Sequence, residues 1–418
     1  ETETESAGIL TMKPFSAVTL SFADLDELKK KSAAFAEKYC FENGILETPY
    51  YRVQTEEKTG RVLQITDKAT GRELLSGRDG FALFDVVREQ IDGSRNPVKR
   101  ETLFGDSVEL RNHDISQWNH DWKALRTRGE SQGFEVERKE YEISLILKES
   151  LEGTEGITRK LTFYTYRPGI RMEASFIKKP VCDPEALYFV VPARMPEGWE
   201  CAYDTAGEIV KLDEEQLGRT CRDYQTVDTA VSLYGGNGCL TLCCPDAPMI
   251  QVGDFQFARE QASVPREKDP LLLGWPMNNY WSTNFMANQS GSTVFVYELN
   301  FHESFSKDQM YADSIRLKQP MVKNVAVQGP FGENVLLRTE GSCQILNVYP
   351  DKAHEGMIAL VKNQNKEPAL CRLTSPVRPV TAAEELTPAE ETVKKLPVEN
   401  GTVVVEMPAR GLMMVRLK

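Results

Sequence analysis

The chain has 418 residues, of which 41% are hydrophobic and 27% charged, with 50 Lys and Arg residues against 62 Asp and Glu residues. This length predicts about two to three domains, and the net charge of −12 argues against nucleic acid or an anionic membrane as a partner, because both require a basic face. No run approaches ~18 consecutive apolar residues, so we expect no membrane-spanning helix and a soluble, acidic, globular protein.

The first residues contain no initiator Met, no basic segment and no apolar leader, and we therefore expect that a preceding segment has been removed. Residues 8–22 form an apolar, strand-like run with no second strand beside it in the sequence. Because a single strand cannot bury itself, we expect this run to pair with a distant sheet or to be the last strand of a domain that the chain lacks.

One segment has a clear helical pattern. Apolar residues recur at a loose helical period over residues 24–39, which predicts a linker helix with Asp24 and Glu27 in its cap. Residues 382–395 contain Pro388 and several acidic side chains. We expect a long acidic loop between strands there rather than a second helix.

Most of the remaining chain consists of short runs in which apolar and polar residues alternate, separated by turns. Residues 141–148 are one such run, and the turn Arg167-Pro168-Gly169 follows the next. This pattern predicts antiparallel sheet. We expect an orphan strand and linker helix in residues 1–40, a large β-supersandwich in residues 41–318 and a C-terminal β-sandwich in residues 319–418.

The nine cysteines do not have the spacing of a zinc ribbon, and their number is odd. A secreted disulfide framework is not expected at this length and spacing. We expect buried free thiols and a reducing compartment, which favours the cytoplasm. The cysteines are Cys40, Cys182, Cys201, Cys221, Cys239, Cys243, Cys244, Cys343 and Cys371.

The densest cluster of aromatic and amide side chains is WPMNNYWSTNF, residues 275–285. Aromatic rings beside amides suit sugar recognition, because rings stack on C–H faces and hydroxyls need polar partners. The alternative is a core strand whose amides bond neighbouring backbone groups, and the residue types leave both readings open. The candidate carbohydrate-binding residues here are Trp275, Asn278, Asn279, Tyr280, Trp281 and Asn284.

A second candidate group is Arg222, Asp223 and Tyr224. These side chains could bind sugar hydroxyls or supply an acid–base pair. The alternative is an interior Arg–Asp pair that braces two sheets. Glycosidase chemistry needs two carboxylates that face each other across a bond, and spacing along the sequence cannot show that geometry.

Residues 112–122 contain the tripeptide Asn-His-Asp twice, centred on His113 and His120. A spacing of seven would place both histidines on one face of a helix, but no third metal ligand is specified. We expect a polar loop, and the role of residues 113–122 stays open. No phosphate-binding loop, nucleophile elbow or metalloprotease helix is present, so we assign no catalytic residue and no metal ligand.

The order of several segments resembles glycoside hydrolase family 38, the α-mannosidase family, and in particular its bacterial branch. MNNYWSTNF, residues 277–285, is the most specific match. The other matching segments are ETPYYRV (47–53), ITDK (65–68), GREL (71–74), GRTCRDY (218–224), PDAP (245–248), VGD (252–254) and ILNVYP (345–350).

This resemblance covers roughly residues 41–418, and residues 8–22 resemble the last strand of a preceding sandwich. It implies an all-β fold, with a galactose-mutarotase-like supersandwich followed by a small immunoglobulin-like β-sandwich. Family members carry the aspartate nucleophile and the zinc ligands on an N-terminal β/α barrel, and no segment here matches that barrel.

The resemblance therefore implies a non-catalytic C-terminal portion of an α-mannosidase-like glycoside hydrolase, inactive alone. Its partner would be the absent catalytic domain, with zinc expected only there, and carbohydrate is a second possible ligand. One alternative is a free-standing carbohydrate-binding protein. Another is an epimerase or lyase on the same supersandwich, for which His113, His120 and His302 are the candidate bases.

Overall fold

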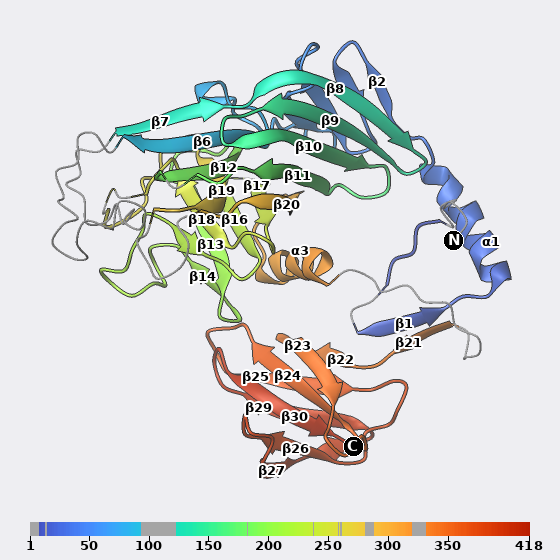
Figure 1. The fold of residues 1–418 in the computed structure, drawn as a ribbon. Coiled ribbons are helices and arrows are strands. Elements are labelled where there is room, and N and C mark those ends of the chain that lie inside the picture. Colours follow the sequence, from blue (N-terminus) through green and yellow to red (C-terminus); the bar gives the residue numbers. More distant parts are fainter. Residues whose placement is uncertain are drawn as a thin grey trace. The chain divides into compact units, whose positions relative to one another are not determined.

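The structure is a computed structural model that describes residues 8–12, 15–92, 123–181, 183–236, 238–257, 259, 261–280, 288–319 and 332–418. Antiparallel sheets dominate these residues (Figure 1), which confirms the predicted all-β class. Residue contacts divide the chain into two compact units. The larger unit comprises Phe35–Ala206 and Val210–Pro320, and the smaller unit comprises Glu1–Ala34, Gly207–Ile209 and Met321–Lys418.

The largest sheet contains nine of the described strands. Strand β11 of this sheet (Ile170–Lys178) alternates between a buried and a more exposed face, whereas every residue of β17 (Gly238–Cys243) is buried. In spatial order its strands are β14 (Glu208–Lys211), β13 (Glu200–Thr205), β16 (Ala230–Gly235), β17 (Gly238–Cys243), β20 (Gly291–His302), β11 (Ile170–Lys178), β10 (Thr154–Tyr164), β9 (Glu142–Ser150) and β8 (Glu130–Lys139).

Two further sheets of the larger unit contain six and four described strands. The six-stranded sheet has the order β15 (Gln225–Thr226), β18 (Met249–Gly253), β19 (Leu271–Asn278), β12 (Glu185–Pro192), β6 (Asp85–Asp92) and β7 (Lys123–Arg128). The four-stranded sheet is a meander of β2 (Cys40–Glu42), β3 (Ile45–Glu47), β4 (Tyr51–Thr55) and β5 (Val62–Asp67). Turns at residues 57–59 and 68–70 enclose β5.

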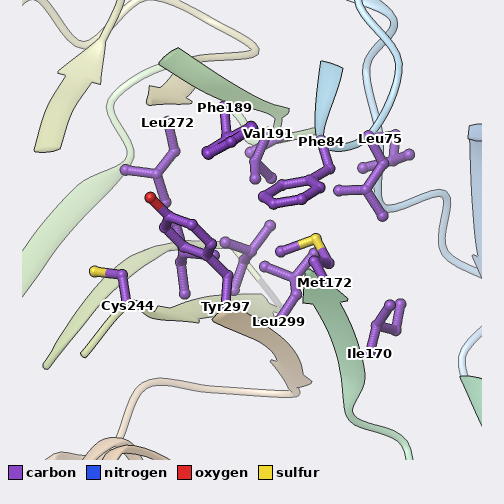
Figure 2. Close-up of a cluster of buried hydrophobic side chains, with 14 of the residues drawn as sticks. Leu75, Phe84, Ile170, Met172, Phe189, Val191, Cys244, Leu272, Tyr297 and Leu299 are labelled. Atoms are coloured by element: carbon purple, nitrogen blue, oxygen red, sulfur yellow. The ribbon is translucent and has the colours of Figure 1, made fainter. Parts of the chain in front are cut away.

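Side chains from all three sheets form one apolar core in the larger unit. Figure 2 shows its centre, where the rings of Phe84 and Phe189 stack with centroids 4.5 Å apart and Tyr297 packs edge-on against both. Gly274 makes this packing possible, because a Cβ atom there would lie 2.8 Å from the Tyr297 ring. The packing of Tyr297 therefore depends on the glycine.

The inner strands of the six-stranded sheet are buried on both faces. All eight residues of β12 are buried, and successive side chains of a strand point to opposite faces. Leu187 and Phe189 join the core that also contains residues of the nine-stranded sheet. Tyr188 and Val190, from the other face, join a separate cluster that contains Trp275. The second face of this sheet is therefore covered by a separate cluster of buried side chains.

Buried ion pairs connect the two large sheets. Arg159 of β10 is fully buried, and its guanidinium bonds both carboxylate oxygens of Glu149 on β9. The same group donates to the carbonyl of Phe84, just before β6, at 2.8 Å. It also lies 3.7 Å from the Asp85 carboxylate. The Arg159 guanidinium thus connects the nine-stranded sheet to the residues at the start of β6, which belongs to the six-stranded sheet.

A second buried group of charges makes a similar connection. Glu185 of β12 accepts from Arg88 Nε of β6 at 2.7 Å, and its other oxygen pairs with Lys178 Nζ of β11. Arg88 also lies 2.8 Å from the carboxylate of Glu152. Because β11 belongs to the nine-stranded sheet and β12 to the six-stranded sheet, these charges again link the two layers.

The smaller unit contains the predicted small β-sandwich, with sheets of four and five described strands around one apolar core. The first sheet has the order β22 (Arg338–Glu340), β25 (Ala369–Thr374), β29 (Thr402–Met407) and β28 (Val398–Glu399). The second has the order β23 (Cys343–Pro350), β24 (Met357–Asn363), β30 (Leu412–Leu417), β26 (Ala383–Leu386) and β27 (Thr392–Leu396).

The strand-like run of residues 8–22 contains one short strand, β1 (Ser16–Thr19), which pairs with β21 (Gly332–Val335). The helix that follows, α1 (Phe22–Ser32), is shorter than the predicted span of residues 24–39. Of the two residues predicted in its cap, Asp24 takes part in the cap and Glu27 does not. Ser21 is the N-cap residue, and Asp24 completes a capping box with it from the third helical position.

Two further elements differ from the sequence-based expectations. Residues 382–395, expected to be a loop, form most of a hairpin between β26 and β27. A helix that was not predicted, α3 (Lys307–Lys318), lies in the larger unit and is N-capped by Ser306. No helix in the described part of the chain is long and apolar enough to cross a membrane.

We predict that Arg159→Met lowers the free energy of unfolding of the larger unit by about 3–5 kcal/mol, because Glu149 would stay buried without its cation. All tryptophans lie between residues 118 and 281, so tryptophan fluorescence during urea denaturation reports on this unit. Arg171→Met removes an ion pair whose side chains are 39% and 35% exposed, and it should cost less than about 1 kcal/mol. Equal effects of the two substitutions would contradict the linking role.

Candidate functional site: a buried carboxylate within an aromatic cluster

The structure brings together side chains from both segments that the sequence singled out. Trp275 lies near the end of β19, and Tyr280 follows two residues after that strand. The Tyr224 ring packs edge-on against Trp275 at a centroid distance of 5.7 Å, and the Tyr280 ring lies 5.9 Å from it. Trp281 and Asn284 lie outside the described residues.

Other aromatic side chains complete this cluster on the second face of the six-stranded sheet. The Tyr188 ring stacks on Trp275 at 5.6 Å, and Phe257 contacts Trp275 and Tyr280 at 5.2 and 5.3 Å. Trp275 is 1% exposed and Tyr280 is fully buried. Neither ring therefore offers an open face to a sugar.

Glu89 of β6 places a carboxylate within this cluster. The side chain is 2% exposed, and its Oε1 accepts hydrogen bonds from the hydroxyls of Tyr188 at 3.1 Å and Tyr280 at 2.8 Å. Its Oε2 accepts from Arg126 Nε at 2.6 Å. Three donors therefore compensate the buried charge.

The neighbours of Glu89 are themselves held in place. Gln251 Nε2 donates to the Tyr188 hydroxyl at 3.0 Å, and Gln251 Oε1 accepts from the backbone N–H of Gln256 at 2.6 Å. The Arg126 guanidinium lies 4.1 Å from the centroid of the Phe255 ring, where cation–π attraction is favourable. Side-chain and backbone contacts therefore both hold the hydrogen-bond partners of Glu89 in position.

Burial raises the pKa of the Tyr188 and Tyr280 hydroxyls well above the ordinary value for tyrosine, and the charge of Glu89 adds to both shifts. Both phenols are therefore protonated donors at neutral pH. Each tyrosine therefore acts as a hydrogen-bond donor to Glu89.

The amides of the predicted site are largely engaged by nearby groups. Asn279 Oδ1 accepts from the backbone N–H of Glu185 at 2.7 Å, and its Nδ2 donates to the carbonyl of Asp183 at 2.9 Å. Asn278 Oδ1 accepts from the N–H of Tyr280 at 3.3 Å. For these two residues, the structure shows the backbone bonding that the alternative reading predicted.

Arg222 and Asp223 stabilise loops in this structure. Arg222 Nε lies 3.0 Å from a carboxylate oxygen of Asp213, whose other oxygen pairs with Arg266 at 2.8 Å. Asp223 Oδ1 accepts from the backbone N–H of Gln261 at 3.4 Å. Both side chains are buried, so the geometry matches an internal brace better than a pair of groups that face a substrate.

Sequence reasoning did not identify Glu89, Tyr188, Gln251 or Arg126. The available signal was a polar residue among apolar ones: Glu89 shares one face of β6 with Val87 and Ile91, and Gln251 lies between Ile250 and Val252 in β18. Their partners could not be read from the sequence, because the bond from Tyr280 to Glu89 spans 191 residues.

Of the three histidines proposed as bases for an epimerase or lyase, the structure describes only His302. His113 and His120 lie outside the described residues, as does the whole segment 113–122. His302, at the end of β20, has its Nε2 2.6 Å from Asp313 Oδ2 of α3. Among the residues that the structure describes, no cluster of three or more His, Cys, Asp or Glu side chains could hold a metal ion.

The sequence matches no protein-family model and no curated protein. Its fold is similar to that of an alpha-mannosidase from Enterococcus faecalis, with a TM-score of 0.63 and 13% sequence identity over 90% of this chain and 42% of that one. It is also similar to a protein in glycosyl hydrolase family 38 from Enterococcus faecalis, with a TM-score of 0.62 and 14% identity over 90% and 44% of the two chains.

These comparisons confirm, at the level of fold, the resemblance to glycoside hydrolase family 38 that the sequence segments predicted. The chain spans less than half the length of the solved structures that it matches. It is thus similar to part of such proteins.

We predict that Glu89→Gln lowers the free energy of unfolding of the larger unit by about 1–3 kcal/mol, because the new amide N–H₂ faces either Arg126 or the two tyrosine hydroxyls as a second donor. Tryptophan fluorescence in urea measures the change. The control, Glu135→Gln, alters a carboxylate that is 64% exposed and paired with Lys148, and should cost less than about 1 kcal/mol. A Glu89→Gln variant as stable as this control would show that the network does not stabilise the fold.

Proposed function

We propose that this chain is the non-catalytic β-rich portion of an α-mannosidase-like glycoside hydrolase and that it supports a separate catalytic domain. The observation that carries the proposal is the fold similarity, which extends over 90% of this chain but over only 42–44% of the two solved structures. The rest of such a protein would supply the catalytic barrel and its zinc.

The described site supports a structural role for the chain's own carboxylates. A glycosidase needs one carboxyl group on each side of the scissile bond, with one acid and one base or nucleophile. Glu89 instead lies in an aromatic cluster and accepts from three side chains. Asp223 is buried and bonded to a backbone N–H, so neither group has a partner carboxylate across an open space.

The aromatic cluster could contribute indirectly to carbohydrate binding. Trp275 and Tyr280 fix the end of β19 from one side, and Asn279 fixes the chain that follows it by bonds to residues 183 and 185. In this proposal the cluster is a rigid support for a surface of the larger unit that helps to hold the substrate of the catalytic domain. A rigid scaffold under a binding segment reduces the entropy lost when the ligand binds.

The proposal predicts that the chain alone does not hydrolyse 4-nitrophenyl α-D-mannopyranoside, with or without added zinc, because the catalytic carboxylates and the zinc would belong to the separate catalytic domain. Release of nitrophenol is measured against a buffer blank and against an intact α-mannosidase as the positive control. Mutarotation of freshly dissolved α-D-galactose, followed by polarimetry, should also proceed at the blank rate. Zinc-dependent hydrolysis that tracks with the purified chain would contradict the proposal, and accelerated mutarotation would favour the epimerase alternative.

A further inference from the structure

The larger unit contains a pocket that shares no residue with the Glu89 cluster. Its volume is about 320 Å³, which falls within the range of small-molecule sites. The walls come from the start of β4, the turn after β5, the segment after β12 and the paired ends of β17 and β20. The lining residues used below are Tyr50, Arg72, Arg194, Phe301, His302 and Glu303.

One wall of this Tyr50 pocket is aromatic. The rings of Tyr50 and Phe301 are partly buried and both line the pocket. Tyr51 packs edge-on against Phe301 at a centroid distance of 6.1 Å, and its hydroxyl donates to the carbonyl of Pro168 at 2.5 Å. The aromatic wall is therefore held by contacts behind it, and it offers an apolar surface to the C–H face of a ligand.

Two polar groups of the pocket have no partner among the described residues, namely the Tyr50 hydroxyl and the Glu303 carboxylate. Burial raises the pKa of Tyr50, so its hydroxyl is present at neutral pH as both a donor and an acceptor. Glu303 is exposed and supplies acceptor oxygens. His302 uses Nε2 to bond Asp313, which leaves Nδ1 as a further polar atom at the pocket.

The arginines supply donors and are held in position. Arg194 Nε donates to the carbonyl of Leu75 at 3.1 Å, and its Nη2 lies 3.2 Å from the Glu73 carboxylate. The Arg72 guanidinium lies on the backbone of Gly238, where an added Cβ would be 1.9 Å from Arg72 Nη1. Glycine at this position is therefore required for the observed placement of Arg72.

The charges of the pocket balance. Arg72 and Arg194 are matched by Asp67 and Glu303 among the described lining residues, so the pocket has no excess positive charge to attract a phosphate. The Glu303 carboxylate would also repel an anion. An aromatic wall with both donors and acceptors around it suits a neutral ligand with several hydroxyl groups.

We propose that the Tyr50 pocket binds the ring of a neutral sugar, with one C–H face on the aromatic wall and the hydroxyls bonded to Tyr50, Glu303 and the arginines. This site is separate from the residues 275–284 that the sequence singled out. It lies within the larger unit and needs no catalytic domain, so it can be tested on the chain as it exists, whatever the outcome for the proposed function.

The test is a saturation-transfer difference NMR titration of the full chain with methyl α-D-mannopyranoside, methyl α-D-glucopyranoside and methyl α-D-galactopyranoside. We expect saturable transfer to at least one of them. Tyr50→Phe and Glu303→Gln should each weaken binding about two- to tenfold, the effect of losing one hydrogen bond. Their controls, Tyr39→Phe and Glu130→Gln, alter the same chemical groups outside the pocket and should leave the affinity unchanged.

Gly238→Ala provides a test that alters none of the six lining residues used above. The new methyl group must displace the Arg72 guanidinium, so it should weaken sugar binding, whereas Gly218→Ala meets nothing within 4 Å and should not. Tryptophan fluorescence in urea verifies that each variant is folded. No saturable transfer to any of the three glycosides, unchanged affinity in the folded pocket variants, loss of binding only in Asn278→Ala, or competition by inorganic phosphate would each overturn the proposal.

Discussion

The buried guanidinium of Arg159 is the interaction on which the arrangement of the larger unit depends. It bonds Glu149 within the nine-stranded sheet and the carbonyl of Phe84 at the start of the six-stranded sheet. Phe84 adopts a left-handed backbone conformation with φ 61°, which is unfavourable for a large side chain. The hydrogen bond from Arg159 and the packing of the Phe84 ring against Phe189 offset that cost.

The position of the six-stranded sheet against the core determines which of its side chains need separate cover on the second face. The first face is covered by the core, so the side chains that point the other way must be covered separately. Aromatic rings supply that cover, and Glu89 is tolerated among them because three donors reach it. The same close packing that makes this cluster a rigid support leaves no open space within it for a catalytic reaction. The Tyr50 pocket lies elsewhere in the larger unit, at the ends of strands, where chain turns leave side chains incompletely packed.

The sequence predicted those parts of the fold whose signal is local. Alternation and turn residues identified the all-β class. Helix α3 was missed because the residues it buries include Asp313 and Ser314 as well as Met310; it has no continuous apolar stripe. Strand β27 was missed because its residues are exposed or only partly buried, so it lacks the alternation that marks a half-buried strand.

The candidate site was only partly predictable for a related reason. Residue types drew attention to rings, amides and an Arg–Asp pair, but the carboxylate at the centre of the cluster lies on a strand far away in the sequence. Whether an amide faces a ligand or the backbone depends on neighbours such as residues 183–185, which sequence spacing does not reveal. The Tyr50 pocket, with walls from six separated segments, had no signal in the sequence at all.

The central claim is that this chain acts as the β-rich support of a glycoside hydrolase. The most direct test is to isolate, from the cells that make it, the polypeptide that contains this sequence, and to map it by mass spectrometry while assaying α-mannosidase activity. The account predicts α-mannosidase activity in a polypeptide well over 418 residues long, or in a complex with a separate catalytic chain. A polypeptide of only 418 residues that is inactive and has no such partner would contradict it.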